Sequence, residues 1–131
     1  MKLICIGDSL TFGYGVHLSQ RWTRLCAQET GWELVNEGIN GDTTGGMLAR
    51  MQGGVLAELR EGGLGADRPY VLLMGGSNDV FYSGSDAAAR ENMGAMIHQL
   101  FSVGVLPMVG IPLPADAPHA PRAILKRRSG R

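Results

Sequence analysis

The chain is poor in several features that mark specialised protein classes. It has 2 cysteines among 131 residues, 6% aromatic residues, and no excess of charge, because 12 basic side chains balance 12 acidic ones. So few cysteines exclude a disulfide-rich scaffold, and no Cys-x-x-Cys pair or His/Cys cluster suggests a metal site. Cys5 lies in an apolar run and Cys26 on the apolar side of an expected helix. Both are therefore expected to be buried, reduced thiols.

Long apolar runs are also missing near the start of the chain. The longest there is Leu3 to Ile6, which is too short for a membrane span or the core of a signal peptide. We therefore expect no membrane partner and a cytoplasmic location. With 44% hydrophobic and 18% charged residues, the composition excludes a disordered chain and indicates one globular domain.

The neutral total conceals an uneven distribution of charge. Five of the basic side chains lie between residues 122 and 131, which leaves seven basic against twelve acidic side chains in residues 1–121. We interpret 1–121 as the domain and 122–131 as a basic tail. Nucleic-acid binding is not expected, because the basic residues form a short terminal cluster without aromatic residues between them.

Apolar runs alternate with helical patterns along the chain. Runs that stop at glycine or proline predict four buried strands, and repeats of three and four residues predict three helices between them. The strands are expected at 3–6, 33–36, 70–74 and 105–111. The helices are expected to begin after Ser19, Thr43 or Thr44, and Ser85, and to end at Gly31, Gly62 and Gly104.

The inward faces of these helices follow from the same repeats. They are Trp22, Leu25 and Cys26 in the first, Met47, Leu48, Met51, Val55, Leu56 and Leu59 in the second, and Met93, Met96, Ile97, Leu100 and Phe101 in the third. This β-α-β-α-β-α-β order predicts right-handed crossovers and a parallel sheet with helices on both faces. Ligands of such folds bind at the carboxyl ends of the strands.

Three glycine-rich polar clusters follow three successive expected strands. They are Gly7-Asp8-Ser9, Asn40-Gly41-Asp42 and Gly76-Ser77-Asn78-Asp79. Glycine-rich loops let backbone N–H groups approach a ligand closely. Ser9 is a candidate nucleophile whose own N–H, together with the Gly41 N–H and the Asn78 amide, could stabilise an oxyanion.

Each cluster alone also fits an ordinary turn. Asp8, Asp42 and Asp79 are read first as structural, each holding its loop through hydrogen bonds to the backbone. It is the joint placement of the clusters at three strand ends that favours a site.

The clusters also carry a family resemblance. The segments I-G-D-S-L-T-F-G-Y-G, N-x-G-x-x-G-D-T from Asn36 to Thr43, and G-G-S-N-D from Gly75 to Asp79 resemble the first three blocks of the GDSL, or SGNH, hydrolases. The resemblance covers residues 3 to about 113. It implies a flavodoxin-like three-layer α/β/α fold and hydrolysis of acyl esters or thioesters without metal or organic cofactor. Ser9 would be nucleophile and first oxyanion donor, Gly41 the second donor and Asn78 the third.

The chain departs from this family in the position of its candidate catalytic base. Family members are longer and carry an Asp-x-x-His block after a fifth strand, whereas Asp116 and His119 directly follow the fourth strand among prolines. These two residues are candidates for the orienting carboxylate and the base, with an exposed proline-rich loop as the alternative. His98 is interpreted as a helix-face residue and His17 as a loop residue.

Two further expectations follow from the shortness of the chain. If the last strand and helix are missing, the fourth strand is an unpaired edge, which a second copy of the chain could cover. A catalytically silent fragment or ligand-binding module that keeps the oxyanion donors is then the alternative to a working esterase.

Three aromatic residues could either wall an acyl pocket or cover the core: Tyr14, Phe81 and Tyr82. A flavodoxin-like nucleotide binder is disfavoured because the first loop lacks a phosphate-binding pattern.

Overall fold

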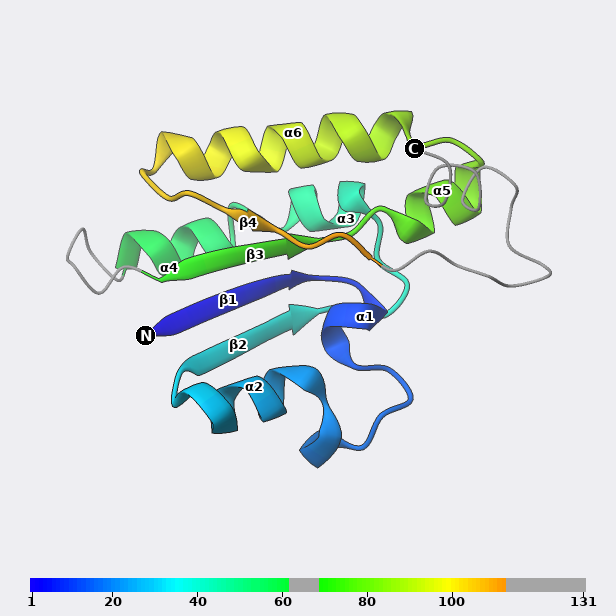
Figure 1. Ribbon diagram of the computed structural model, residues 1–131. Coiled ribbons are helices and arrows are strands. Elements are labelled where there is room, and N and C mark those ends of the chain that lie inside the picture. Colours follow the sequence, from blue (N-terminus) through cyan, green and yellow to red (C-terminus); the bar gives the residue numbers. More distant parts are fainter. Residues whose placement is uncertain (62–68, 113–131) are drawn as a thin grey trace.

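The computed structural model describes residues 1–61 and 69–112. Within them, four strands form one parallel sheet in the order β2-β1-β3-β4 (Figure 1). The strands are β1 (Lys2–Gly7), β2 (Glu33–Gly38), β3 (Tyr70–Met74) and β4 (Met108–Val109). Gly7 pairs with Gly38 on one side and Met74 on the other, so the carboxyl ends of the three longer strands are level.

Helices connect the strands and flank the sheet. Before β2 come α1 (Ser9–Phe12), the short 3₁₀ helix η1 (Leu18–Gln20) and α2 (Trp22–Thr30). Between β2 and β3 lie α3 (Thr44–Ala49) and α4 (Val55–Glu61), and β3 is followed by α5 (Ser77–Ser83) and α6 (Ala87–Ser102). Figure 1 shows α2 and α6 flanking the sheet from opposite sides. The predicted parallel α/β/α architecture is confirmed.

The core lies between the sheet and the helices α3, α4 and α6. Ile4 and Ile6 of β1 contribute alternate side chains to it, as strand geometry requires. The helices supply fully buried methionines and leucines, among them Met47, Met96 and Leu100. Leu3 and Cys5, which point the other way, are also buried, so β1 is covered on both faces as its continuous apolar run predicts.

The long helix expected from Thr43 to Glu61 is two helices. Thr43 caps α3 by accepting a hydrogen bond from the Gly46 N–H, as predicted, but the helix ends at Ala49 and α4 begins at Val55. The intervening turn contains Gly53 and Gly54, and paired glycines in a helix each cost about 1 kcal/mol relative to alanine. The apolar repeat of three and four residues persists across the break because both helices bury the same side.

The limits and faces of the other two helices also differ in part from expectation. Ser19 lies in η1 rather than at a helix cap, and α2 begins after Arg21. Leu25 and Phe101, both predicted to face inward, are about half exposed. The helix α5 was not predicted, because its short polar sequence carries no apolar repeat.

The fourth strand is shorter than the predicted run 105–111. Only Met108 and Val109 pair with β3, and β4 lies at one edge of the sheet. Both paired residues are exposed, as are Leu106 and Ile111. Coverage of this edge by a second copy of the chain stays a prediction. The division at residue 121 and the basic tail lie outside the described residues.

Candidate active site

The three predicted clusters lie at the level carboxyl ends of β1, β2 and β3. Ser9 begins α1 two residues after β1, Gly41 follows β2 by three residues, and Asn78 lies in the first turn of α5 after β3. Hydrogen bonds join the clusters, because the Ile39 N–H donates to the Gly7 carbonyl at 3.1 Å and the Asn78 Nδ2 to the Asp42 carbonyl at 2.8 Å. The second loop is thus tied to both of its neighbours.

Ser9 is presented by the start of a helix. Asp8 is the buried N-cap of α1, and its carboxylate accepts a hydrogen bond from the Leu10 N–H at 2.9 Å. Ser9 is half-buried, and neither its hydroxyl nor its N–H has a hydrogen-bond partner within residues 1–61 and 69–112. A first-turn N–H has no acceptor within its own helix and is therefore available to an anion.

Gly38 lets β2 approach this helix. A Cβ at residue 38 would lie 2.3 Å from the Phe12 nitrogen and 2.8 Å from the Asp8 carbonyl oxygen. Both are backbone atoms that cannot move aside. Glycine at this position therefore permits the second loop to begin directly beside the helix that carries Ser9.

Gly41 occupies a tight turn. The Asp42 N–H donates to the Ile39 carbonyl at 3.1 Å, and Gly41 itself has φ of +78°, a conformation that disfavours residues with a Cβ. In the described part of the chain its N–H donates to no acceptor. The turn therefore leaves a second backbone donor exposed at the same end of the sheet.

Asn78 supplies a side-chain donor. One N–H of its amide donates to the Asp42 carbonyl, which holds the side chain over the second loop. An amide nitrogen carries two hydrogens, and within the described ranges the second has no acceptor. Ser9, Gly41 and Asn78 together offer three N–H groups at neighbouring strand ends.

Asp79, a buried residue of the third cluster, is hydrogen-bonded to Thr44, which follows the second cluster. It is 7% exposed, and its carboxylate accepts hydrogen bonds from the Thr44 N–H at 2.8 Å and the Thr44 hydroxyl at 2.6 Å. A carboxylate at the start of α3 also complements the positive end of the helix dipole. Asp8, Asp42 and Asp79 thus all hold loops through hydrogen bonds to the backbone, as expected.

Arg50 was not predicted as a site residue, and its side chain connects the ends of two strands with the second loop. Its guanidinium donates to the carbonyls of Gly7 at 2.9 Å and Glu37 at 2.7 Å and forms an ion pair with Asp42 at 3.0 Å. It therefore ties the ends of β1 and β2 to the loop that carries Gly41. An arginine one position before the inward-facing Met51 was the sequence signal for this role.

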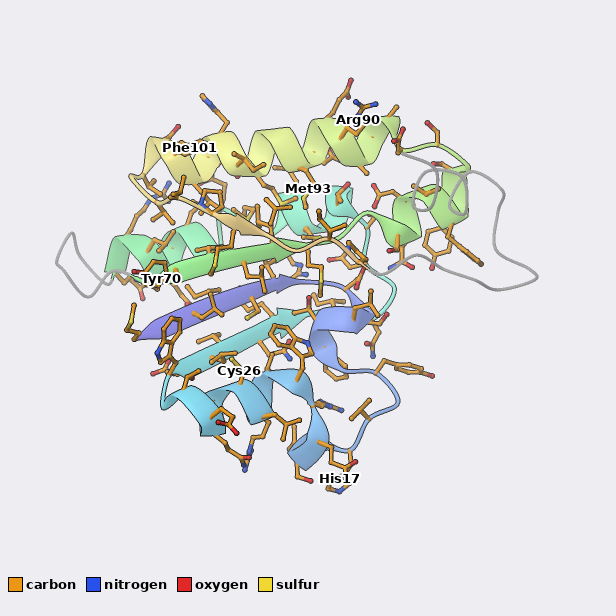
Figure 2. The ribbon with its side chains drawn as sticks, viewed as in Figure 1. His17, Cys26, Tyr70, Arg90, Met93 and Phe101 are labelled. Atoms are coloured by element: carbon orange, nitrogen blue, oxygen red, sulfur yellow. The ribbon has the colours of Figure 1, made fainter. Side chains whose placement is uncertain are left out.

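The candidate base lies outside the described residues, since neither Asp116 nor His119 falls within 1–61 or 69–112. His17 is an exposed loop residue, as interpreted from the sequence, and its Nδ1 accepts a hydrogen bond from the Ser19 N–H. Figure 2 shows His17 at the margin of the molecule beside α2, turned away from the sheet. His98 is exposed in the middle of α6.

Aromatic side chains lie on the solvent side of the loops. Tyr14, Phe81 and Tyr82 are each more than half exposed, so they do not cover the core. A methyl group built on Gly41 would lie 3.9 Å from the Tyr82 hydroxyl. Tyr82 therefore stands beside one of the candidate oxyanion donors.

The two cysteines contribute no second nucleophile. Both are free, Cys5 buried and Cys26 half-buried. Burial, with a smaller effect of Cys26, raises the pKa of the Cys5 thiol to about 12. Cys5 is therefore a protonated core residue at neutral pH.

Comparison with known proteins shows the family of the chain. Residues 5–129 match the model of the GDSL-like Lipase/Acylhydrolase family. The chain is 30% identical over 129 residues to Esterase TesA of Pseudomonas aeruginosa, covering 93% of this chain and 59% of the relative. It thus spans about three-fifths of that curated protein's length.

Solved structures agree in fold. A G-D-S-L family protein from Desulfitobacterium hafniense superposes with a TM-score of 0.79 at 26% identity, covering 97% of this chain and 67% of the other. A crystal structure of TesA gives a TM-score of 0.75 at 29% identity, covering 99% and 71%. By its motifs, its strand order and these matches, the chain belongs to the GDSL-like lipase/acylhydrolase family.

Proposed function

We propose that the chain is a serine hydrolase that cleaves small carboxylic esters or thioesters through an acyl-enzyme. The observation that carries this proposal is that the N–H groups of Ser9 and Gly41 have no acceptor within residues 1–61 and 69–112, while the Asn78 amide is bonded to the Asp42 carbonyl, next to Gly41 in the chain. Donors of this kind stabilise an alkoxide, and one of them belongs to the residue that carries the serine hydroxyl. Family membership supports the same chemistry.

In this mechanism the Ser9 Oγ attacks the carbonyl carbon of the ester. A C–O bond forms, the carbonyl π electrons move onto oxygen, and the three N–H groups stabilise the resulting charge. Collapse expels the alcohol or thiol and leaves an acyl-serine. Water then attacks this intermediate, releases the acid and restores the Ser9 hydroxyl.

A base must accept the proton of the Ser9 hydroxyl and later pass it to the leaving group. We propose His119, oriented by Asp116, because a serine hydroxyl is a weak nucleophile until a base accepts its proton. With the base absent, a residual acceleration of about 10³–10⁴ over water would survive from the oxyanion donors and binding.

Hydrolysis of p-nitrophenyl butyrate by the full chain tests the proposal. We expect turnover that Ser9→Ala abolishes and that Ser102→Ala, at an exposed serine on α6, leaves unchanged. Loss of turnover in His119→Ala would identify the base. Equal rates for wild type and Ser9→Ala would contradict the proposal and favour a catalytically silent binding module.

A cytoplasmic location is also proposed. Two free cysteines suit a reducing compartment. No helix in residues 1–61 and 69–112 is long and apolar enough to span a bilayer. Cell fractionation with an antibody to the chain would test the location.

A further inference from the structure

A pocket of about 280 Å³ lies beside α2, and Ser9, Gly41 and Asn78 are not among the residues that line it. Its walls come from α1, η1, α2 and β2. The pocket meets α1 at Phe12, the last residue of the helix, whereas Ser9 is the first. The rest of its lining comes from η1, α2 and β2 and contains none of the three candidate oxyanion donors.

Arg21 is fixed in this pocket by contacts along its whole side chain. Its aliphatic part packs so closely on Gly13 that a Cβ there would lie 2.7 Å from the Arg21 Cγ. Its guanidinium carbon lies 4.5 Å from the centroid of the Phe12 ring, and its Nε donates to the Val16 carbonyl at 3.1 Å. A guanidinium held in place in this way loses little freedom when it binds a ligand.

Within residues 1–61 and 69–112, no hydrogen bond or ion pair engages the terminal nitrogens of Arg21. Within the described residues, neither Arg21 nor Arg24, one helical turn later, forms an ion pair, and no acidic residue lines the pocket. Arg24 is exposed at the rim. Two arginines that form no ion pair in the described part of the chain therefore line one hollow.

The remaining wall is mostly apolar. Phe12, Leu18, Ala27 and Leu34 contribute to it. Thr23 and Asn36 also line the pocket, but Asn36 already donates to the Thr11 carbonyl and to the Thr23 hydroxyl. The pocket is thus smaller than a typical drug-sized site and combines two cationic groups with a short hydrophobic wall.

We propose that this pocket binds a small carboxylate with a short apolar chain. The carboxylate would pair with Arg21 and Arg24, because the planar guanidinium matches a carboxylate in a two-point hydrogen bond. The apolar chain of the ligand would lie against Phe12 and Leu34. This assignment does not depend on the proposed esterase activity, because no residue of the pocket belongs to the oxyanion donors or the nucleophile.

NMR titration of the full chain with hexanoate tests the proposal. We expect saturable shifts in the amide signals of Thr23, Arg24 and Ala27, with a dissociation constant of about 1 mM, and no shift at Arg90. Figure 2 shows Arg90 on α6, far across the molecule from Cys26 of α2. The alcohol 1-hexanol has the same alkyl chain without the carboxylate and tests whether binding needs the charge. Inorganic phosphate has charge without an alkyl chain and tests whether binding needs the apolar wall.

Variants assign the binding to the arginines. Arg21→Gln should weaken hexanoate binding about tenfold and Arg24→Gln about threefold, whereas Arg90→Gln should leave it unchanged. Arg24 is exposed, and no side-chain hydrogen bond or ion pair involves it within the described residues, so its substitution tests mainly the effect of charge. Ser9→Ala should bind hexanoate like wild type whether or not the chain is an esterase.

Several outcomes would overturn the assignment. Equal affinity for 1-hexanol would remove the role of the arginines, and equal affinity for phosphate would remove the role of the apolar wall. Shifts that do not saturate, or that spread equally to α6, would show that hexanoate has no site here. Unchanged binding in both Arg21→Gln and Arg24→Gln would place the ligand elsewhere.

Discussion

Replacement of Arg50 by lysine should loosen the loop that carries Gly41. The guanidinium of Arg50 binds two backbone carbonyls and the Asp42 carboxylate at once, at 2.7 to 3.0 Å. These three acceptors belong to the end of β1, the end of β2 and the second loop. A lysine keeps the charge, but a single ammonium group cannot span acceptors placed around a planar fork.

The size of the effect follows from the burial of the pair. The side chains of Arg50 and Asp42 are 25% and 14% exposed, so water only partly replaces the lost contacts. Hydrogen bonds to charged groups contribute about 1.5–3 kcal/mol each, and lysine should keep one of the three. Two lost bonds would cost about 3–6 kcal/mol, and partial access of water reduces this, so we expect Arg50→Lys to lower the free energy of unfolding by about 2–4 kcal/mol, out of a total of about 5–15 kcal/mol.

Urea unfolding and ester hydrolysis measure the two consequences. The urea midpoint should fall in Arg50→Lys and stay unchanged in Arg90→Lys, which alters an exposed arginine on α6. At temperatures where both proteins are folded, kcat should fall more than KM changes, because a displaced donor weakens the transition state in particular. A midpoint and kcat equal to those of wild type would refute the role assigned to Arg50.

Three further predictions concern buried or partly buried groups. Asp79→Asn should lower the urea midpoint, because the Thr44 N–H and hydroxyl lose a charged acceptor; an unchanged midpoint would show that the charge is dispensable. Burial first, and Glu58 second, raise the pKa of Glu37 above its ordinary 4.5, so the folded chain holds this proton longer. Stability should therefore fall as pH rises from 4.5 through the folded pKa, and less so in Glu37→Gln, as urea midpoints across that range would show. Cys5 should resist thiol reagents at pH 8 until the chain unfolds, because its pKa is about 12, while Cys26 reacts first; mass spectrometry of the labelled chain distinguishes them.

The general architecture and the loops of the site could be predicted from local sequence. Buried strands that stop at glycine are visible as apolar runs, and alternating strands and helices specify a parallel sheet. Strand β3 has the predicted bounds, Tyr70–Met74. Once the strands are parallel, Ser9, Gly41 and Asn78 must lie at one end of the sheet, because each follows the carboxyl end of a strand.

The features that local sequence could not show depend on contacts between distant residues. Arg50 bonds to Gly7 across 43 positions, and Asp79 to Thr44 across 35. An apolar repeat also says which side of a helix is buried without saying whether the helix is continuous, so the break between α3 and α4 was missed. The arginine pocket arises only where α2 packs against β2, which no periodicity encodes.

A crystal structure of the chain after covalent reaction with an alkyl phosphonate ester tests the central proposal most directly. We expect phosphorus bonded to the Ser9 Oγ, with one phosphonyl oxygen at about 2.7–3.1 Å from the nitrogens of Ser9 and Gly41 and from the Asn78 Nδ2. A phosphonyl oxygen turned to solvent and beyond hydrogen-bond distance of all three nitrogens would contradict it.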